Sequence, residues 1–133
     1  MSLNEQTILR DFVADVTGLV VRPIFDGIEL KVDEKPFATI KLLNDADFSS
    51  TKLKDSIESS ELYEIVVYPT SNKEQRTICE NIKNKLSCAS FDEFTVADNI
   101  GVQPVGPESP ADLLNYHRAY ISVTITKRTH RRN

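Results

Sequence analysis

The last extended segment constrains the fold more than any other feature of this sequence. From residue 119 to residue 126, Ala119, Ile121, Val123 and Ile125 alternate with Tyr120, Ser122, Thr124 and Thr126. A period of two residues predicts a β-strand with one buried face. One strand cannot bury that face alone, so the remaining chain must supply neighbouring strands and a covering layer.

The first candidate for the covering layer is residues 4–18, "NEQTILRDFVADVTG". Asn4 is a suitable N-cap and Gly18 a suitable stop signal. Ile8, Phe12 and Val16 recur every four residues, with Leu9 and Val13 beside them. The spacing predicts an amphipathic helix whose apolar stripe is centred on Ile8, Phe12 and Val16.

The second candidate is residues 70–87, "TSNKEQRTICENIKNKLS". Ser71 followed by Glu74 has the spacing of a capping box. Ile78, Ile82 and Leu86 form the expected buried stripe, with Cys79 at its flank. A second amphipathic helix is therefore predicted here.

Further strands are predicted on both sides of the second helix. Residues 28–43 read as a β-hairpin, residues 61–69 as a strand and residues 100–105 as an extended segment. Residues 19–25 are too short and proline-marked for a central strand, and residues 108–114 suggest a short helical turn. We therefore expect a single α+β domain over residues 1–133, a mostly antiparallel β-sheet with two main α-helices on one face.

Two segments do not fit this regular pattern. Residues 44–60 are polar, rich in Ser and Asp, and are predicted to form a long flexible loop. Residues 127–133 form a predicted basic C-terminal tail beyond the last strand. These segments, together with the arginine that introduces the last strand, supply the candidate assembly contacts: Asp45, Asp47, Phe48, Lys52, Lys54, Arg118, Lys127, Arg128, Arg131 and Arg132.

Charge is distributed unevenly along the chain. The net charge is -4, yet the last seven residues hold four basic and no acidic residues, so the first 126 residues carry -8. Such asymmetry is typical of an interaction tail, although a solvated, frayed terminus would look the same.

The residues offer no catalytic or metal-binding pattern. His117 and His130 lack partners at metal-ligand spacing, and Cys79 and Cys88 match no zinc motif. Residues 45–56 lack the glycine and the glutamate of a calcium loop, and no phosphate-binding glycine loop is present. No apolar run is long enough to cross a bilayer. We expect a structural protein without enzymatic activity, cofactor or metal, and without membrane contact.

The layout of the whole chain resembles the tail terminator, or neck terminator, proteins of long-tailed bacteriophages and prophages. The resemblance rests on four segments, in this order: "ILRDFVADVTG", "YEIVVYPTSNKEQRTICENIKNKL", "NIGVQPVGPESPADLLNYHRAY" and "RAYISVTITKR". It covers most of the chain through the order and spacing of elements, while residues 44–60 match nothing specific.

The resemblance implies a homohexameric ring in the virion tail or neck, assembled in the bacterial cytoplasm. Such a ring caps the tail-tube protein, stops tube polymerisation and docks onto the head–tail connector or stopper protein. DNA passes through its lumen without specific binding, and no cofactor is implied.

Two other functions fit the sequence. Another head–tail joining, head-completion or tail-tube subunit would have a similar pattern. A nucleic-acid-binding module could use the basic C-terminal tail, but the rest of the chain is acidic and lacks a pattern of stacking aromatics.

Overall fold

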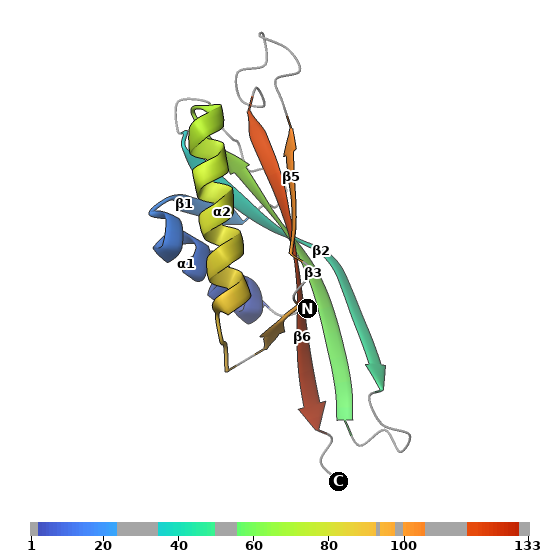
Figure 1. Cartoon of the computed structure of the whole chain (residues 1–133). Coiled ribbons are helices and arrows are strands. Elements are labelled where there is room, and N and C mark those ends of the chain that lie inside the picture. The colour runs from blue at the N-terminus through green and yellow to red at the C-terminus, as the bar shows by residue number, and fades with distance from the viewer. Residues whose placement is uncertain are drawn as a thin grey trace.

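The computed structural model describes residues 3–23, 35–49, 56–92, 94–97, 100–105 and 117–130. Two helices are present in this part of the chain, α1 (Leu3–Thr17) and α2 (Asn72–Cys88). The strands are β1 (Val20–Pro23), β2 (Phe37–Ser49), β3 (Ser56–Tyr68), β4 (Thr95–Val96), β5 (Gly101–Val105) and β6 (Arg118–His130). The predicted α+β class is confirmed, since two helices accompany one mostly antiparallel sheet (Figure 1).

The sheet is built around β6, which contains the alternating residues 119–126. Its order is β1-β2-β3-β6, and β4 and β5 both pair with the far edge of β6. All pairs are antiparallel except β1 with β2. The four-residue β1 lies at the sheet edge, in agreement with the prediction that residues 19–25 do not form a central strand.

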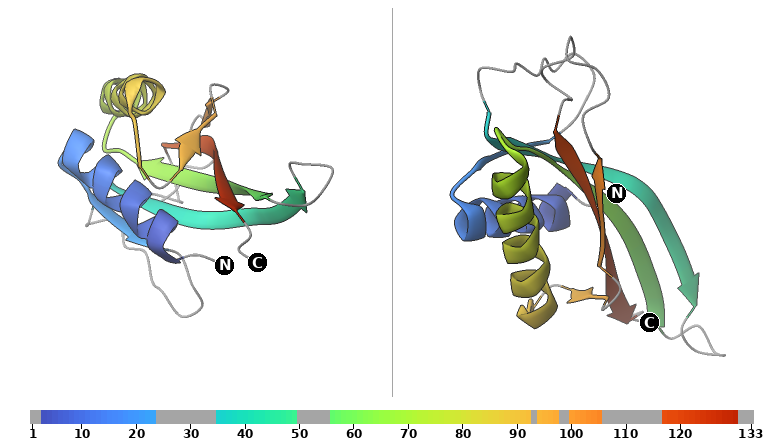
Figure 2. Two further views of the ribbon diagram at one scale, coloured as in Figure 1. Left: turned by 90° about the horizontal axis from the view of Figure 1, so that it is seen from below. Right: turned by 45° about the horizontal axis from the view of Figure 1, so that its top comes forward.

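Both helices cover the same face of the sheet, as predicted (Figure 2). Ala119, Ile121, Val123 and Ile125 of β6 are fully buried on that face, which confirms the alternation read from the sequence. Their neighbours in the core include Tyr63, Ile65 and Val67 of β3.

In α1, the predicted stripe is shifted by one residue. Leu9 and Val13 are fully buried in the core, whereas Ile8 and Phe12 are partly buried and pack at the margin of the core. The buried row continues one turn back to Glu5, because residues four apart share a helix face. Asn4 lies inside the helix rather than at its cap, because α1 begins at Leu3. Gly18 ends the helix as predicted, with φ of 73°.

In α2, the predicted face and N-terminal cap are both confirmed. Ile78, Ile82 and Leu86 are buried, with Cys79 beside them. The Ser71 side chain accepts a hydrogen bond from the Glu74 backbone N–H at 3.1 Å. Glu74 does not close the box on Ser71; its Oε1 instead accepts hydrogen bonds from the backbone N–H and the hydroxyl of Thr70.

A smaller apolar cluster lies on the opposite face of the sheet. Phe37 stacks on Tyr68 with ring centroids 4.8 Å apart, and Val66 and Tyr120 pack with them. These residues occupy the alternate positions of β2, β3 and β6, so this end of the sheet is buried on both faces.

The predictions for the two irregular segments were wrong where the structure describes them. Residues 44–49 belong to β2 and residues 56–60 to β3, so most of the predicted loop is a pair of strands. Lys127–His130 continue β6 rather than forming a tail. The polar composition of these segments predicted a loop and a tail. A strand without a covering layer need not carry alternating apolar residues, so polar composition does not exclude a strand.

These strands extend past the helices as a three-stranded ribbon, formed by residues 44–49, 56–60 and 126–130 (Figure 1). We call this part of the sheet the ribbon. The predicted strand at residues 28–33 and the predicted turn at residues 108–114 lie outside the described residues.

Candidate assembly surface

The candidate contacts chosen from the sequence do not form one site. Asp45, Asp47 and Phe48 lie on β2, and Arg128 lies on β6 in register with Glu58 of β3. Arg118 begins β6, nine residues before Lys127, so the two backbone positions are roughly 30 Å apart. Lys52, Lys54, Arg131 and Arg132 lie outside the described residues.

Lys127 forms an ion pair with the first helix. Its Nζ lies 2.8 Å from Oε1 of Glu5, a residue 122 positions away in the sequence. The Glu5 side chain is 3% exposed, whereas that of Lys127 is 39% exposed. Part of the basic C-terminal end is thus neutralised within the same chain.

The other Glu5 oxygen, Oε2, is buried without a hydrogen-bond partner. A buried carboxylate is stable only if it is paired and hydrogen-bonded, so Lys127 is essential to the charge at this position. The contact fixes the start of α1 against the base of the ribbon.

Arg118 belongs to the cluster at the opposite end of β6. Its Nε donates a hydrogen bond to the Tyr120 hydroxyl at 2.8 Å, and its guanidinium lies 5.7 Å from the Tyr120 ring centroid. Burial is the main cause that raises the pKa of the neighbouring Tyr68 hydroxyl, with Tyr120 adding to it and Arg118 opposing it. Arg118 therefore has an intramolecular structural role on the face without helices.

A cavity of about 310 Å³ lies between α2 and β5. The sheet is wider than the two helices, and β5 lies at the edge beyond β6. Val102 and Pro104 register with Ile121 and Ala119, so they share the helix-covered face of the sheet. We call this cavity the α2–β5 groove; its lining comprises Gln75, Arg76, Cys79, Glu80, Lys83, Val102 and Pro104.

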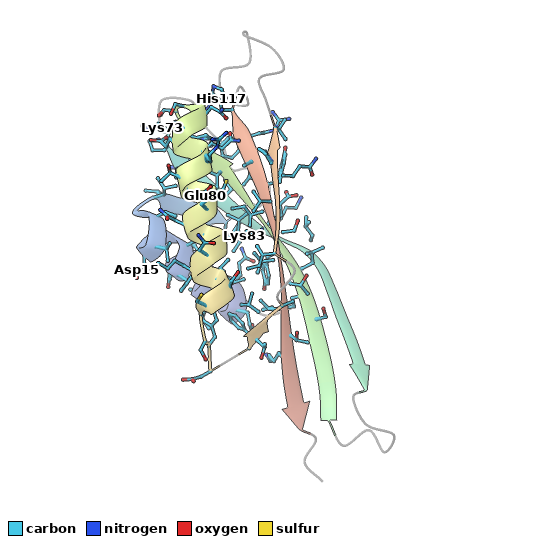
Figure 3. All side chains as sticks on the ribbon, in the orientation of Figure 1. Asp15, Lys73, Glu80, Lys83 and His117 are labelled. Carbon is cyan, nitrogen blue, oxygen red and sulfur yellow. The ribbon has the colours of Figure 1, made fainter. Side chains whose placement is uncertain are left out.

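The groove combines an apolar floor with charged walls. Arg76, Glu80 and Lys83 are exposed along α2, and Figure 3 labels the last two. Gln75 is only 4% exposed, and its Oε1 is buried without a hydrogen-bond donor. An unpaired buried acceptor is costly to the folded state.

Cys79 supplies no reactive nucleophile to this groove. Burial raises the pKa of its thiol to about 11, so the thiol stays protonated at neutral pH. Within the described ranges, no group of three or more His, Cys, Asp or Glu side chains could hold a metal ion. No helix in the same part of the chain is long and apolar enough to cross a membrane.

Sequence reasoning missed the burial of Glu5 and Gln75, which each have an unpaired buried oxygen among the described residues. Both could have been suspected from helix spacing, because Glu5 precedes Leu9 by four residues and Gln75 precedes Cys79 by four. The Lys127 partner of Glu5 could not, since these two residues approach each other only through tertiary folding.

Comparison with known proteins adds no family assignment. No family model and no curated protein matches this chain.

Proposed function

We propose that this protein is a tail terminator of a long-tailed bacteriophage or prophage. In this function it caps the tail tube as a hexameric ring, stops tube polymerisation and forms the interface to the head connector. It acts as a structural virion protein rather than an enzyme. The proposal rests on the resemblance described above, and one structural observation supports an assembly role.

That observation is the ribbon that extends past the helices. Beyond its pairing with β1 at residues 37–40, β2 has no described neighbour on its outer side, and β5 has none beyond β6. Open edges at opposite sides of one sheet suit a head-to-tail contact, and such contacts form rings when the rotation closes.

The alternative function, nucleic-acid binding through the basic C-terminal end, has less support because part of that end is engaged within the chain. It requires the basic end of the chain to be available to phosphates, yet Lys127 bonds Glu5 and the backbone of Lys127–His130 is paired with β3. Another joining or tube subunit has the same requirements as a terminator and stays the main alternative.

The test is deletion of the gene from its phage or prophage, followed by electron microscopy of the lysate. Loss of a terminator predicts tails of uncontrolled length that carry no heads, with recovery when the gene is supplied on a plasmid. Normal-length tails without heads would instead indicate a head-completion protein, and absence of tubes would indicate a tube subunit. A salt-dependent gel shift with DNA would favour the nucleic-acid function.

A further inference from the structure

The two lateral sides of the molecule have complementary surfaces. The sheet order places β1 at one edge and β5 at the other. Helix α1 contacts β1 and β2, whereas α2 contacts β3 and β6, so each helix belongs to one side (Figure 1). The α2–β5 groove therefore lies on the side opposite α1 and β1, where a second copy of the chain could reach it.

The groove presents unpaired charges beside an apolar floor. Its wall on α2 carries the exposed residues Arg76, Glu80 and Lys83, and none of the three forms an ion pair within the described ranges. Its floor on β5 includes Val102 and Pro104. With two cations and one anion, the wall suits an occupant that carries two carboxylates beside an apolar side chain.

The exposed side of α1 has the opposite balance of charge. Asp11 and Asp15 are both exposed and lie four residues apart, so they share one side of the helix. Arg10 lies 3.4 Å from Asp11, whereas Asp15 has no ion pair in the described part of the chain. This surface holds two anions and one cation, and Figure 3 shows Asp15 on the side of the molecule away from β5.

The formal charges of the two helices agree with this local comparison. Helix α2 holds four basic and two acidic residues, a charge of +2, and α1 holds one basic and three acidic residues, a charge of -2. Glu5, the third acid of α1, is already paired with Lys127. The outward charge of α1 is thus -1 and that of the groove wall is +1, and such complementarity fixes which surfaces meet.

An exposed apolar side chain lies next to the acids of α1. Val20 of β1 follows Asp15 by five residues, after the turn at Gly18, and is 64% exposed. In the described ranges, Leu43 is the other large apolar side chain with high exposure, at 45%. The groove, at about 310 Å³, is at the lower end of the range of binding pockets, about 300–1,000 Å³, so its size suits a few side chains.

From these observations we propose that the α1–β1 surface of one copy, made of Asp11, Asp15 and Val20, binds the α2–β5 groove of the next copy. Val20 packs on the apolar floor, and Asp15 faces Lys83 or Arg76. The contact joins opposite sides of the molecule, so it repeats head to tail. It deepens the proposed function by naming the ring contact, and it rests on that function only for its closure into six.

The test uses the full chain with a photo-crosslinking amino acid in place of Val20, and the same substitution at Leu43 as the matched exposed control. Irradiation of mixed light and heavy isotope-labelled protein is followed by mass spectrometry. We expect crosslinks from position 20 to residues 75–83 or 101–105 of a second copy, with a yield at least tenfold above that from position 43. Crosslinks only within one copy, or equal yields from the two positions, would overturn the proposal.

Charge reversal gives the second arm. Lys83→Glu should reduce the crosslink yield from position 20 at least tenfold, because it places a third carboxylate against Asp11 and Asp15. Asp15→Lys combined with Lys83→Glu should restore the yield. Lys85→Glu, the same change at an exposed position of α2 outside the groove lining, should have a smaller effect. Equal losses from Lys83→Glu and Lys85→Glu, or a double variant without recovery, would contradict the contact.

Sedimentation of the wild-type chain gives the third arm. We expect the average mass to rise with protein concentration, and Lys83→Glu to suppress the rise. A wild-type chain that stays monomeric up to about 1 mM has a dissociation constant above that concentration and would overturn the proposal.

These outcomes are separable from the fate of the proposed function. Copies that associate through the groove while the gene deletion leaves normal tails would retain the contact and reject the terminator. Uncontrolled tail length in the deletion, with a wild-type chain that does not use the groove, would do the reverse.

Discussion

At the scale of single residues, two polar side chains, Glu5 of α1 and Gln75 of α2, are buried together with the apolar core. Glu5 occupies a position in the buried row of α1 where an aliphatic residue would pack, and it depends on Lys127. Gln75 is buried near the start of α2, and its Oε1 has no hydrogen-bond partner in the described part of the chain.

The Glu5–Lys127 pair makes an asymmetric prediction for stability. Lys127→Met leaves a buried carboxylate without its partner and should destabilise the fold by about 3 kcal/mol. Glu5→Gln leaves a lysine that is already partly exposed and should cost about 1–2 kcal/mol. Urea unfolding measures both, and the double variant Glu5→Leu with Lys127→Met should recover most of the loss. Equal costs for the two single changes would contradict the pairing.

The cysteines give a prediction about reactivity. Cys88 is exposed, whereas Cys79 is buried and burial raises the pKa of its thiol to about 11. Because the thiolate is the reacting form, Cys79 becomes reactive only as the pH rises toward that value. At pH 8 the native chain should release one equivalent of thionitrobenzoate from Ellman's reagent quickly, and two after unfolding. The Cys88→Ser variant, which should show no fast phase, is the control.

At the scale of elements, the sequence predicted periodic segments well and aperiodic ones poorly. The alternation of β6 and the stripe of α2 were correct because burial on one face imposes a period on the sequence. The strands of the ribbon were not predicted, because no covering layer imposes an alternating apolar period on their residues. For α1, the stripe was misplaced by one residue, because Ile8 and Phe12 have the same spacing as Leu9 and Val13, and periodicity alone does not show which row faces the sheet.

The packing of α2 can be tested at its centre. Ile82 is fully buried against the sheet, so Ile82→Asp would bury an unpaired charge and should cost several kcal/mol, enough to prevent folding. Asn81→Asp introduces the same charge at the adjacent exposed position and should change stability by less than about 0.5 kcal/mol. Circular dichroism melting compares the two. A folded Ile82→Asp variant with wild-type melting would mean that α2 presents another face.

At the scale of the whole molecule, the sheet is longer and wider than its helical cover. The excess length is the ribbon and the excess width is the α2–β5 groove (Figures 1 and 2). No motif marks either feature in the sequence, because each arises from how elements of different length are stacked. The candidate contacts chosen from composition therefore found the ribbon through Asp45, Asp47 and Arg128 but missed the groove entirely.

The basic C-terminal end supplies the last prediction, because two deletions separate the strand residues 128–130 from Arg131 and Arg132. Removing residues 128–133 takes away the register partners of Ser56, Ile57 and Glu58, so it should lower the melting temperature of the monomer. Removing only residues 131–133 leaves every described strand intact and should leave melting unchanged.

Both truncated genes are then supplied to the deletion phage, and infectious particles are counted. If Arg131 and Arg132 contact the neighbouring ring, the shorter deletion should reduce particle yield at least tenfold without loss of monomer stability, because it removes two cations that complementary charge would use. A normal particle yield from the shorter deletion, with a reduced yield from the longer one, would mean that the basic end contributes to the sheet of its own subunit and not to a contact with the neighbouring ring. In that case the positive charges at the end of the chain serve the fold of their own subunit, as the contact between Lys127 and Glu5 already does.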